Sequence, residues 1–295
     1  MRFLGNGLCV DRKTFNAKSA RCSMRTDVQS SIDRWLTRPL CRRYVGAVFC
    51  STPTSSVANG RRESAVIFWG LGRLATGEVD VVGAWLSREM GTPAPASMFG
   101  DLRSRGAEFI RLGVGNLEGV DNAFKQIYRH SEFVPSMEQE LEAVLALVAL
   151  RHRATVAGQL RAVAEAKEAD ARRAGLEKFQ ASCLGERYPE VAERWARALA
   201  GFEPIYKLSA QLRGLVRSAD RTAAEVRGRL TRAILRHGPF VDSTAALEFV
   251  ATTLDRAEQR LDRERAVAVA AREAGSTTLR RHPPIAGAVS VPALA

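Results

Sequence analysis

The sequence predicts a mixed α/β fold of the α+β type: a mixed sheet, a large all-α insertion and C-terminal helices. Three β-like apolar runs lie close together, separated by Gly, Pro, Asn and Ser turn signals: residues 43–52, 64–74 and 78–88. After residue 136 the apolar positions recur at helical spacing: Leu141, Val144, Leu145 and Val148. A change from strand-like to helical periodicity within one chain is typical of this class.

The N-terminal part is polar and irregular up to residue 30. Residues 27–40 predict one short helix, with Ser30 or Ser31 as its N-cap and an end before Pro39, because the residue before a proline disfavours helix. The ordered chain is therefore expected to begin near residue 31.

The sheet domain is expected over residues 31–135. The three β-like runs suit an antiparallel meander. Four further elements complete a βββαβαβ order: a helix at 99–107, a strand at 108–114, a helix at 117–130 and an edge strand at 131–136. The stretch RLGVGNLEGVDNAF, residues 111–124, reads as a strand end, a Gly-rich turn and a helix start.

The rest of the chain is predicted to be helical, except at its end. Residues 136–210 form the helical insertion, and residues 211–275 form C-terminal helices that complete the core. Residues 276–295 are rich in Pro, Ala and other small residues, which predicts a disordered tail.

Composition excludes several classes of protein. Hydrophobic residues at 46% and charged residues at 26% suit a globular protein, and no apolar run approaches the roughly 20 residues of a membrane span. No secretory h-region forms at the N-terminus, so we expect a cytoplasmic protein without a membrane partner. The five cysteines form no C-x-x-C pair, which predicts free thiols and no zinc site: Cys9, Cys22, Cys41, Cys50 and Cys183.

The net charge of +12 and the pI near 10.1 indicate a polyanionic partner, most simply the phosphate backbone of nucleic acid. An alternative remains open, because 38 of the 44 basic residues are Arg and a GC-rich genome could impose that usage without any selection for binding.

Several stretches together resemble the catalytic part of Mutator-type bacterial insertion-sequence transposases. The matching stretches, in the family's order between residue 35 and about residue 260, are WLTRPLCRRYVGAVF, VIFWGLGRLATGEVDVVGAWLSRE, DLRSRGAEFIRLGVGNLEGVDNAF, RYPEVAERW and HGPFVDSTAALEFV. The resemblance implies an RNase H-like core interrupted by a helical insertion. Family chains carry a long DNA-binding part ahead of this core, so this chain is expected to be truncated at its N-terminus.

The resemblance also implies metal-dependent DNA strand cleavage and joining, in which acidic side chains hold two divalent ions. The first family aspartate would lie at the end of the first predicted strand, where this chain has Ser51. The second falls on Gly115, or on Asn116 if the register shifts by one. A family Cys and His three residues apart correspond to Ser136 and Gln139. We therefore expect no metal site and no cofactor, with Mg²⁺ or Mn²⁺ needed only if activity survives.

The last family carboxylate, a glutamate on a helix after the insertion, corresponds to Glu225, our candidate catalytic residue. The alternative is an ion pair, because Glu225 belongs to a row at four-residue spacing with Arg213, Arg217, Arg221 and Arg229. This helix also supplies the candidate DNA-binding residues, for which a solvated face is the alternative: Arg213, Arg217, Arg229 and Arg232.

Other polar and aromatic residues have structural explanations. Three aspartates are expected at a strand start, at a helix cap and in a first helical turn: Asp80, Asp101 and Asp121. The histidines lack the spacing of a zinc site: His130, His152, His237 and His282. Three tryptophans are expected in the core: Trp69, Trp85 and Trp195.

Two functional hypotheses follow. The chain is either a transposase of DNA transposition, or a catalytically inactive remnant that binds DNA or pairs with itself or with an intact relative. Ser51 and Gly115 favour the second, since neither supplies a carboxylate. A decayed reading frame that folds poorly is a third possibility, against which the regular hydrophobic patterning argues.

Overall fold

A computed structural model of the chain describes residues 32–58, 61–87 and 94–280. Residues 32–36 are helical and the helix ends before Pro39, as predicted. The two candidate cap residues, Ser30 and Ser31, and the irregular segment 1–30 lie outside the described residues.

The centre of the molecule is a five-stranded mixed sheet in the order β4-β3-β2-β6-β7. The first three strands along the chain are antiparallel neighbours, which confirms the predicted meander: β2 (Gly46–Ala58), β3 (Arg61–Arg73) and β4 (Val79–Ser87). Two short strands extend the sheet in parallel, with the second at its edge as predicted: β6 (Leu112–Val114) and β7 (Glu132–Val134). A separate parallel pair is formed by β1 (Arg43–Tyr44) and β5 (Phe109–Ile110).

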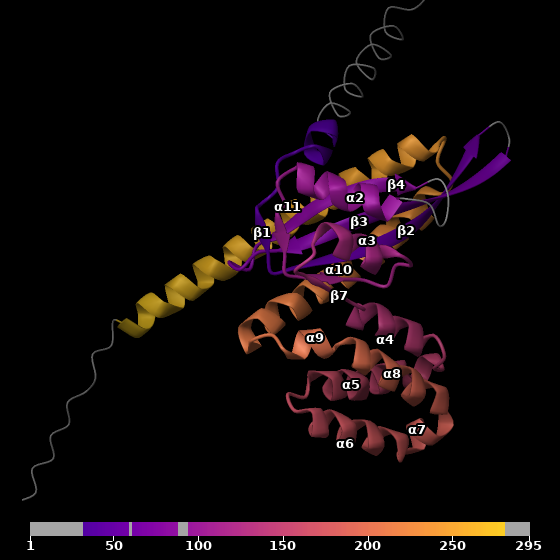
Figure 1. Cartoon of the computed structure of the whole chain (residues 1–295), viewed down its shortest axis with the longest axis vertical. Helices are drawn as coiled ribbons and strands as arrows, with labels where there is room; N and C mark the ends of the chain where they lie inside the picture. Colours follow the sequence, from indigo (N-terminus) through magenta and orange to yellow (C-terminus); the bar gives the residue numbers. More distant parts are fainter. Residues whose placement is uncertain (1–31, 59–60, 88–93, 281–295) are drawn as a thin grey trace, which may run out of the picture.

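Strand β2 is longer than its predicted end at residue 52. The stretch PTSSVA, residues 53–58, reads as loop by composition, yet each of its residues pairs with a residue of β3. Part of the reason is inside the core, where Thr52 accepts a 2.9 Å hydrogen bond from the fully buried indole of Trp69. The paired strand ends of β2 and β3 extend beyond the rest of the sheet in Figure 1.

Helices cover both faces of the sheet (Figure 1). On one face α2 (Ala94–Ser104) and α3 (Val120–Ile127) enclose an aromatic cluster in which the Phe99 ring meets Phe49 and Phe124 edge-on. On the other face lie α10 (Ala210–His237) and α11 (Ser243–Arg280). The β7 strand is followed by the helical part that separates it from α10.

Six helices form this part, which begins at the Ser136 cap and corresponds to the predicted insertion. They are α4 (Met137–Leu145), α5 (Leu150–Glu165), α6 (Ala169–Gln180), α7 (Cys183–Arg187), α8 (Pro189–Gly201) and α9 (Glu203–Tyr206). Their buried residues, with Trp195 fully enclosed, are continuous with those beneath the sheet. The insertion and the sheet therefore share one hydrophobic core.

Helix α11 extends to Arg280, five residues into the segment that was expected to be disordered. No proline occurs in this helix, and the next one in the sequence is Pro283, so nothing in the backbone chemistry stops the helix at residue 275. Residues 281–295 lie outside the described part of the chain.

The tryptophan predictions are confirmed for Trp69 and Trp195, both fully buried, whereas Trp85 is half-buried and donates to Asp101 at 2.9 Å. Asp101 lies in the second half of α2, so the expectation of a helix cap was wrong: its carboxylate also pairs with Arg105 one turn later. Asp121 lies in the first turn of α3, as predicted.

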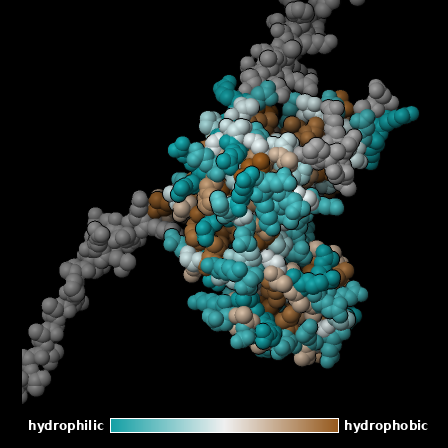
Figure 2. Space-filling view, viewed as in Figure 1, coloured by the Kyte–Doolittle hydropathy of each residue, from teal (hydrophilic) through white to brown (hydrophobic). Residues whose placement is uncertain are grey.

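Three thiols are free in the described residues: Cys41, Cys50 and Cys183. Cys9 and Cys22 lie outside them. Hydrophilic residues dominate the face drawn in Figure 2, where hydrophobic ones show in scattered patches. Among the described residues, no helix is both long and apolar enough to cross a bilayer.

Candidate functional site

The carboxyl ends of the two parallel strands β6 and β7 meet the start of α4 and the middle of α10. Asn116 follows β6 by one residue beyond Gly115, Ser136 follows β7, and Asp220 approaches from α10. This is the edge at which mixed α/β sheets commonly place ligands, since loops and helix ends converge there. It is also where the sequence placed the second family carboxylate.

Position 115 has no room for a side chain. Gly115 is buried and its N–H donates to the Val134 carbonyl at 3.0 Å. A Cβ atom added here would lie 2.6 Å from the backbone oxygen of Phe49 on β2. Because that neighbour is strand backbone and cannot rotate away, an aspartate at residue 115 requires the two strands to move apart.

Asn116 is fully engaged with protein partners. Its Oδ1 atom accepts the backbone N–H of Ser136 at 2.6 Å, and its Nδ2 atom donates to Glu140 at 2.5 Å. The side chain thus ties the turn after β6 to the first turn of α4. Asn116 acts as a structural clamp, whichever register is taken for the family carboxylate.

Ser51 lies within β2, opposite Phe68 of β3, and seven residues before the strand ends. It is half-buried, while its neighbour Cys50 is 1% exposed and accepts a weak hydrogen bond at 3.7 Å from Gln139 Nε2. Burial raises the pKa of the Cys50 thiol to about 12, with the carboxylates of Asp220 and Glu142 adding to the rise and Arg227 opposing it. Cys50 is therefore a neutral thiol at physiological pH.

A carboxyl group not singled out by sequence reasoning lies at the centre of the site. Asp220 is 4% exposed; it accepts a 2.6 Å hydrogen bond from the Ser136 hydroxyl and a 3.2 Å bond from the Glu138 N–H. Ser136 caps α4 by accepting the Gln139 N–H at 3.1 Å. Asp220 occupies the apolar face of α10 between Val216 and Ala223, and a lone acidic residue at such a position was the available signal.

Burial raises the pKa of Asp220 to about 6, despite the opposing hydrogen bonds from Ser136 and the Glu138 backbone. The nearby Glu138 carboxylate pushes the pKa in the same direction as burial. Glu138 is itself 8% exposed and is neutralised by Arg161, whose guanidinium lies 2.7 Å from its Oε2 atom. Asp220 and the Oε2 atom of Glu138 are thus held by protein donors, whereas Glu138 Oε1 is buried without a hydrogen-bond partner among the described residues.

These residues do not fit a pair of divalent metal ions. Such ions need several carboxylate oxygens with free lone pairs, as in two-metal phosphoryl-transfer sites. Ser51 is neutral, Gly115 is blocked, and Asp220 already accepts two hydrogen bonds from protein donors. Within the described ranges, no group of three His, Cys, Asp or Glu side chains is arranged to hold a metal ion.

Glu225, the candidate catalytic residue, lies away from this cluster. Its side chain is 68% exposed, and its nearest ion-pair contact is Arg229 at 4.0 Å. Five residues separate it from Asp220, which places the two side chains about 140° apart around the helix. The structure therefore does not bring Glu225 together with Ser51 and Gly115.

The arginine row on α10 winds around the helix, because each four-residue step turns it by about 40°. Arg213 and Arg217 point into the protein, donating to the carbonyls of Leu208 and Ala164. Desolvation lowers the pKa of Arg217. Arg229 and Arg232, nearer the C-terminal end, are exposed.

The remaining predicted residues have local partners. The Asp80 carboxylate on β4 accepts a 2.8 Å hydrogen bond from the Tyr44 hydroxyl. His152 bonds the Tyr188 hydroxyl at 2.9 Å, and the His237 ring stacks on Phe240. His130 lines an open cavity, and His282 lies outside the described residues.

Comparison with known proteins places the chain among transposases. The sequence profile described as "Transposase, Mutator family" matches residues 8–263. The transposase for insertion sequence element ISRM3 of Rhizobium meliloti (strain 1021) is 24% identical over 237 residues, which are 80% of this chain and 59% of the relative. A probable transposase of Corynebacterium diphtheriae is 26% identical over 217 residues, which are 72% of this chain and 62% of the relative. The chain spans about three fifths of the length of these relatives.

The close approach at residue 115 is testable with a matched pair of glycine substitutions. Gly115→Ala should lower the free energy of unfolding by about 1–3 kcal/mol, the usual effect of overpacking. Gly158→Ala, in α5 with nothing within 4 Å of the added Cβ, should raise it by up to about 1 kcal/mol through helix propensity. Urea unfolding monitored by circular dichroism measures both, and equal effects would contradict the proposed backbone contact.

The buried carboxyl of Asp220 should give stability a pH dependence. Because its folded pKa of about 6 exceeds its ordinary value of 3.8, the folded chain retains the proton between these values. The proton bound to Asp220 stabilises the folded chain fully at a pH below 3.8. This stabilisation, about 3 kcal/mol, is lost as the pH rises through the folded pKa of about 6. In Asp220→Asn this loss should disappear, as urea unfolding between pH 4 and pH 7 would measure. Parallel curves for the two proteins would exclude this titration.

Proposed function

The chain belongs to the Mutator family of transposases, and from that premise we propose that it acts on DNA in transposition with a strand-cleaving site that is catalytically impaired. The observation that carries the impairment is the blocked position 115, where the backbone oxygen of Phe49 occupies the space of a Cβ atom. A family carboxylate at this position would have to displace a strand. The backbone geometry at residue 115 therefore leaves no space for the carboxylate side chain.

The strand order supports an RNase H-like core for this proposal. Three antiparallel strands are followed by two strands that run parallel to the first, in the order β4-β3-β2-β6-β7, and the helical part enters after the last of them. In such a core the middle of β2 and the end of β6 lie side by side. Here those places hold Cys50, Ser51 and Gly115, which together offer no carboxylate oxygen.

The alternative is a non-catalytic remnant that binds DNA or a partner. It is favoured by the exposed arginines at the C-terminal end of α10, since guanidinium groups bind phosphates without reading bases. Arg229 and Arg232 are the candidates for direct phosphate contact, whereas Arg213 and Arg217 contact protein carbonyls and hold α10 in place. The partner would be a second copy of this chain or an intact relative.

Strand nicking tests the impaired site. We expect the folded chain to show no Mg²⁺- or Mn²⁺-dependent nicking of DNA that carries the terminal repeats of its parent element, because too few ligands remain for the ions. Glu225→Ala serves as the control, and the longer Rhizobium meliloti relative on its own element ends provides the positive reaction. Nicking by the unaltered chain that Glu225→Ala abolishes would show a working site and refute the impairment.

DNA binding tests the arginine assignment. Fluorescence anisotropy with a short duplex between 50 and 200 mM salt should show weaker binding for Arg229→Gln/Arg232→Gln. The slope of log affinity against log salt should fall by about 2, since each lost phosphate contact removes about 0.9. Arg173→Gln on α6, whose side chain is 72% exposed, is the matched control and should leave the slope unchanged. Equal slopes for the double variant and the control would place the contact elsewhere.

A further inference from the structure

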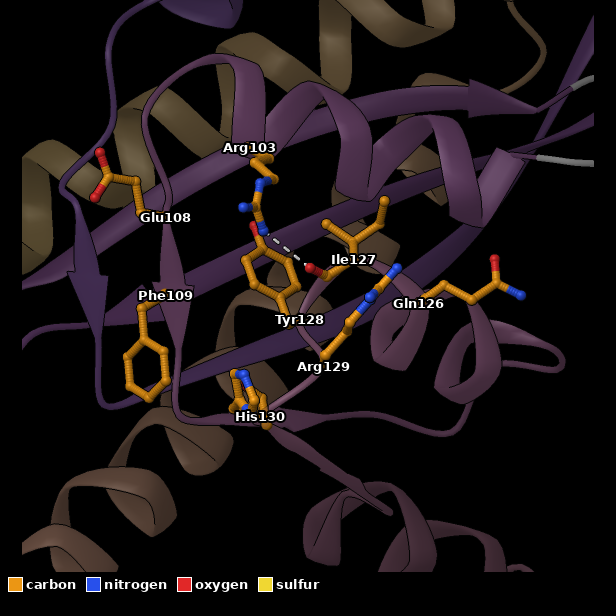
Figure 3. Close-up of a pocket in the computed structure, with 9 residues that line it drawn as sticks. Arg103, Glu108, Phe109, Gln126, Ile127, Tyr128, Arg129 and His130 are labelled. Carbon is orange, nitrogen blue, oxygen red and sulfur yellow. Dashed lines mark hydrogen bonds between the residues drawn. The ribbon is translucent and has the colours of Figure 1, made fainter.

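An open cavity of about 500 Å³ lies at the opposite ends of β6 and β7 from Asn116 and Ser136. It is formed where α2 ends, where β5 begins and where the chain leaves α3 for β7 (Figure 3). The residues that matter for its chemistry are Arg103, Phe109, Tyr128, Arg129 and His130. None of them belongs to the site described above.

The cavity carries free positive charge. Neither Arg103 nor Arg129 has a carboxylate partner among the ion pairs of the described residues, and both side chains are exposed. Arg103 donates to the Ile127 carbonyl at 2.9 Å, which fixes its guanidinium over the cavity and leaves other N–H donors of the fork available. The one acidic residue in the wall, Glu108, is paired at 3.1 Å with Arg42.

Two rings border the space beneath these donors. Phe109 extends from β5 on one side, and His130 lies below Tyr128 on the other (Figure 3). Phe109 is half-buried and His130 exposed, so each presents ring surface to the cavity. Tyr128 forms a rigid wall, because its hydroxyl donates to the Ala107 carbonyl at 2.9 Å and its ring packs on Phe124.

We propose that this cavity binds a single nucleotide. The phosphate accepts hydrogen bonds from Arg103 and Arg129, and the base lies against the rings of Phe109 and His130. Stacking of bases on aromatic side chains beside guanidinium groups is a general mode of nucleotide recognition. The shared chemistry comes either from a free nucleotide or from a nucleotide in a single DNA strand, and binding here is independent of strand cleavage.

Ligand-observed NMR on the whole chain tests the proposal with dAMP, deoxyadenosine and inorganic phosphate as probes. The expected order of affinity is dAMP, then phosphate, then deoxyadenosine. Arg103→Gln/Arg129→Gln should abolish binding.

Lys125→Gln supplies the matched control, because Lys125 is an exposed cation on α3 outside the cavity wall. Unchanged dAMP affinity in Arg103→Gln/Arg129→Gln, or no dAMP binding to the folded chain at 10 mM, would overturn the proposal. Equal affinity for phosphate and dAMP would contradict the proposed contact between the base and the rings of Phe109 and His130. If a short single-stranded oligonucleotide displaces dAMP, the natural ligand is a nucleotide within a DNA strand. If it does not, the natural ligand is a free nucleotide. Both outcomes support nucleotide binding in this cavity. The result of the DNA-binding experiment with Arg229→Gln/Arg232→Gln does not affect dAMP binding in the cavity, so the two proposals can fail independently.

Discussion

The buried carboxyl of Asp220 joins the three parts of the molecule that meet at the candidate site. Its hydrogen bonds to the Ser136 hydroxyl and the Glu138 N–H hold the first turn of α4 against α10. Ser136 in turn donates its own N–H to Asn116 in the turn after β6. The sheet, the helical insertion and the C-terminal helices are thus linked through one polar chain inside an apolar core. Because a partly satisfied buried network is costly, each member restrains the others.

The same linkage bears on the proposed loss of metal ligands. In a working two-metal site, repulsion between clustered carboxylates is relieved by the bound ions. Here protein groups hold the carboxyl groups: Asp220 accepts hydrogen bonds, Glu138 pairs with Arg161, and Glu142 pairs with Arg227. One oxygen, Glu138 Oε1, is buried without a hydrogen-bond partner in the described part of the chain, and the Arg221 guanidinium lies 3.9 Å from it. The approach of the Gly115 backbone to the Phe49 carbonyl closes the space at the end of β6.

Sequence periodicity predicted the meander, the edge strand and the helical part, because these depend on which face of each element is apolar. It did not predict the length of β2, since Ser, Thr and Pro favour loops locally and only pairing with β3 makes PTSSVA, residues 53–58, a strand. Position 115 was predicted to lack a ligand, but its closure depends on Phe49, which is distant in sequence. Asp220 was missed because its role requires knowing that Ser136 lies opposite it. Residues whose function depends on a distant partner were thus the ones that local pattern could not assign.

The same limit applies to the net charge. A count of +12 suggests a broadly basic surface, yet many arginines serve the fold: Arg105 donates to backbone carbonyls of Leu36 and Val82, Arg73 bonds Gly77 and Ser218, and Arg172 lies over the ring of Tyr206. Guanidinium groups held in this way keep their charge but cannot reach a phosphate. Those that remain accessible include Arg229 and Arg232 on α10 and Arg103 and Arg129 at the cavity. Contact with a polyanion should therefore be concentrated at a few points, because geometry rather than total charge decides which cations meet a phosphate.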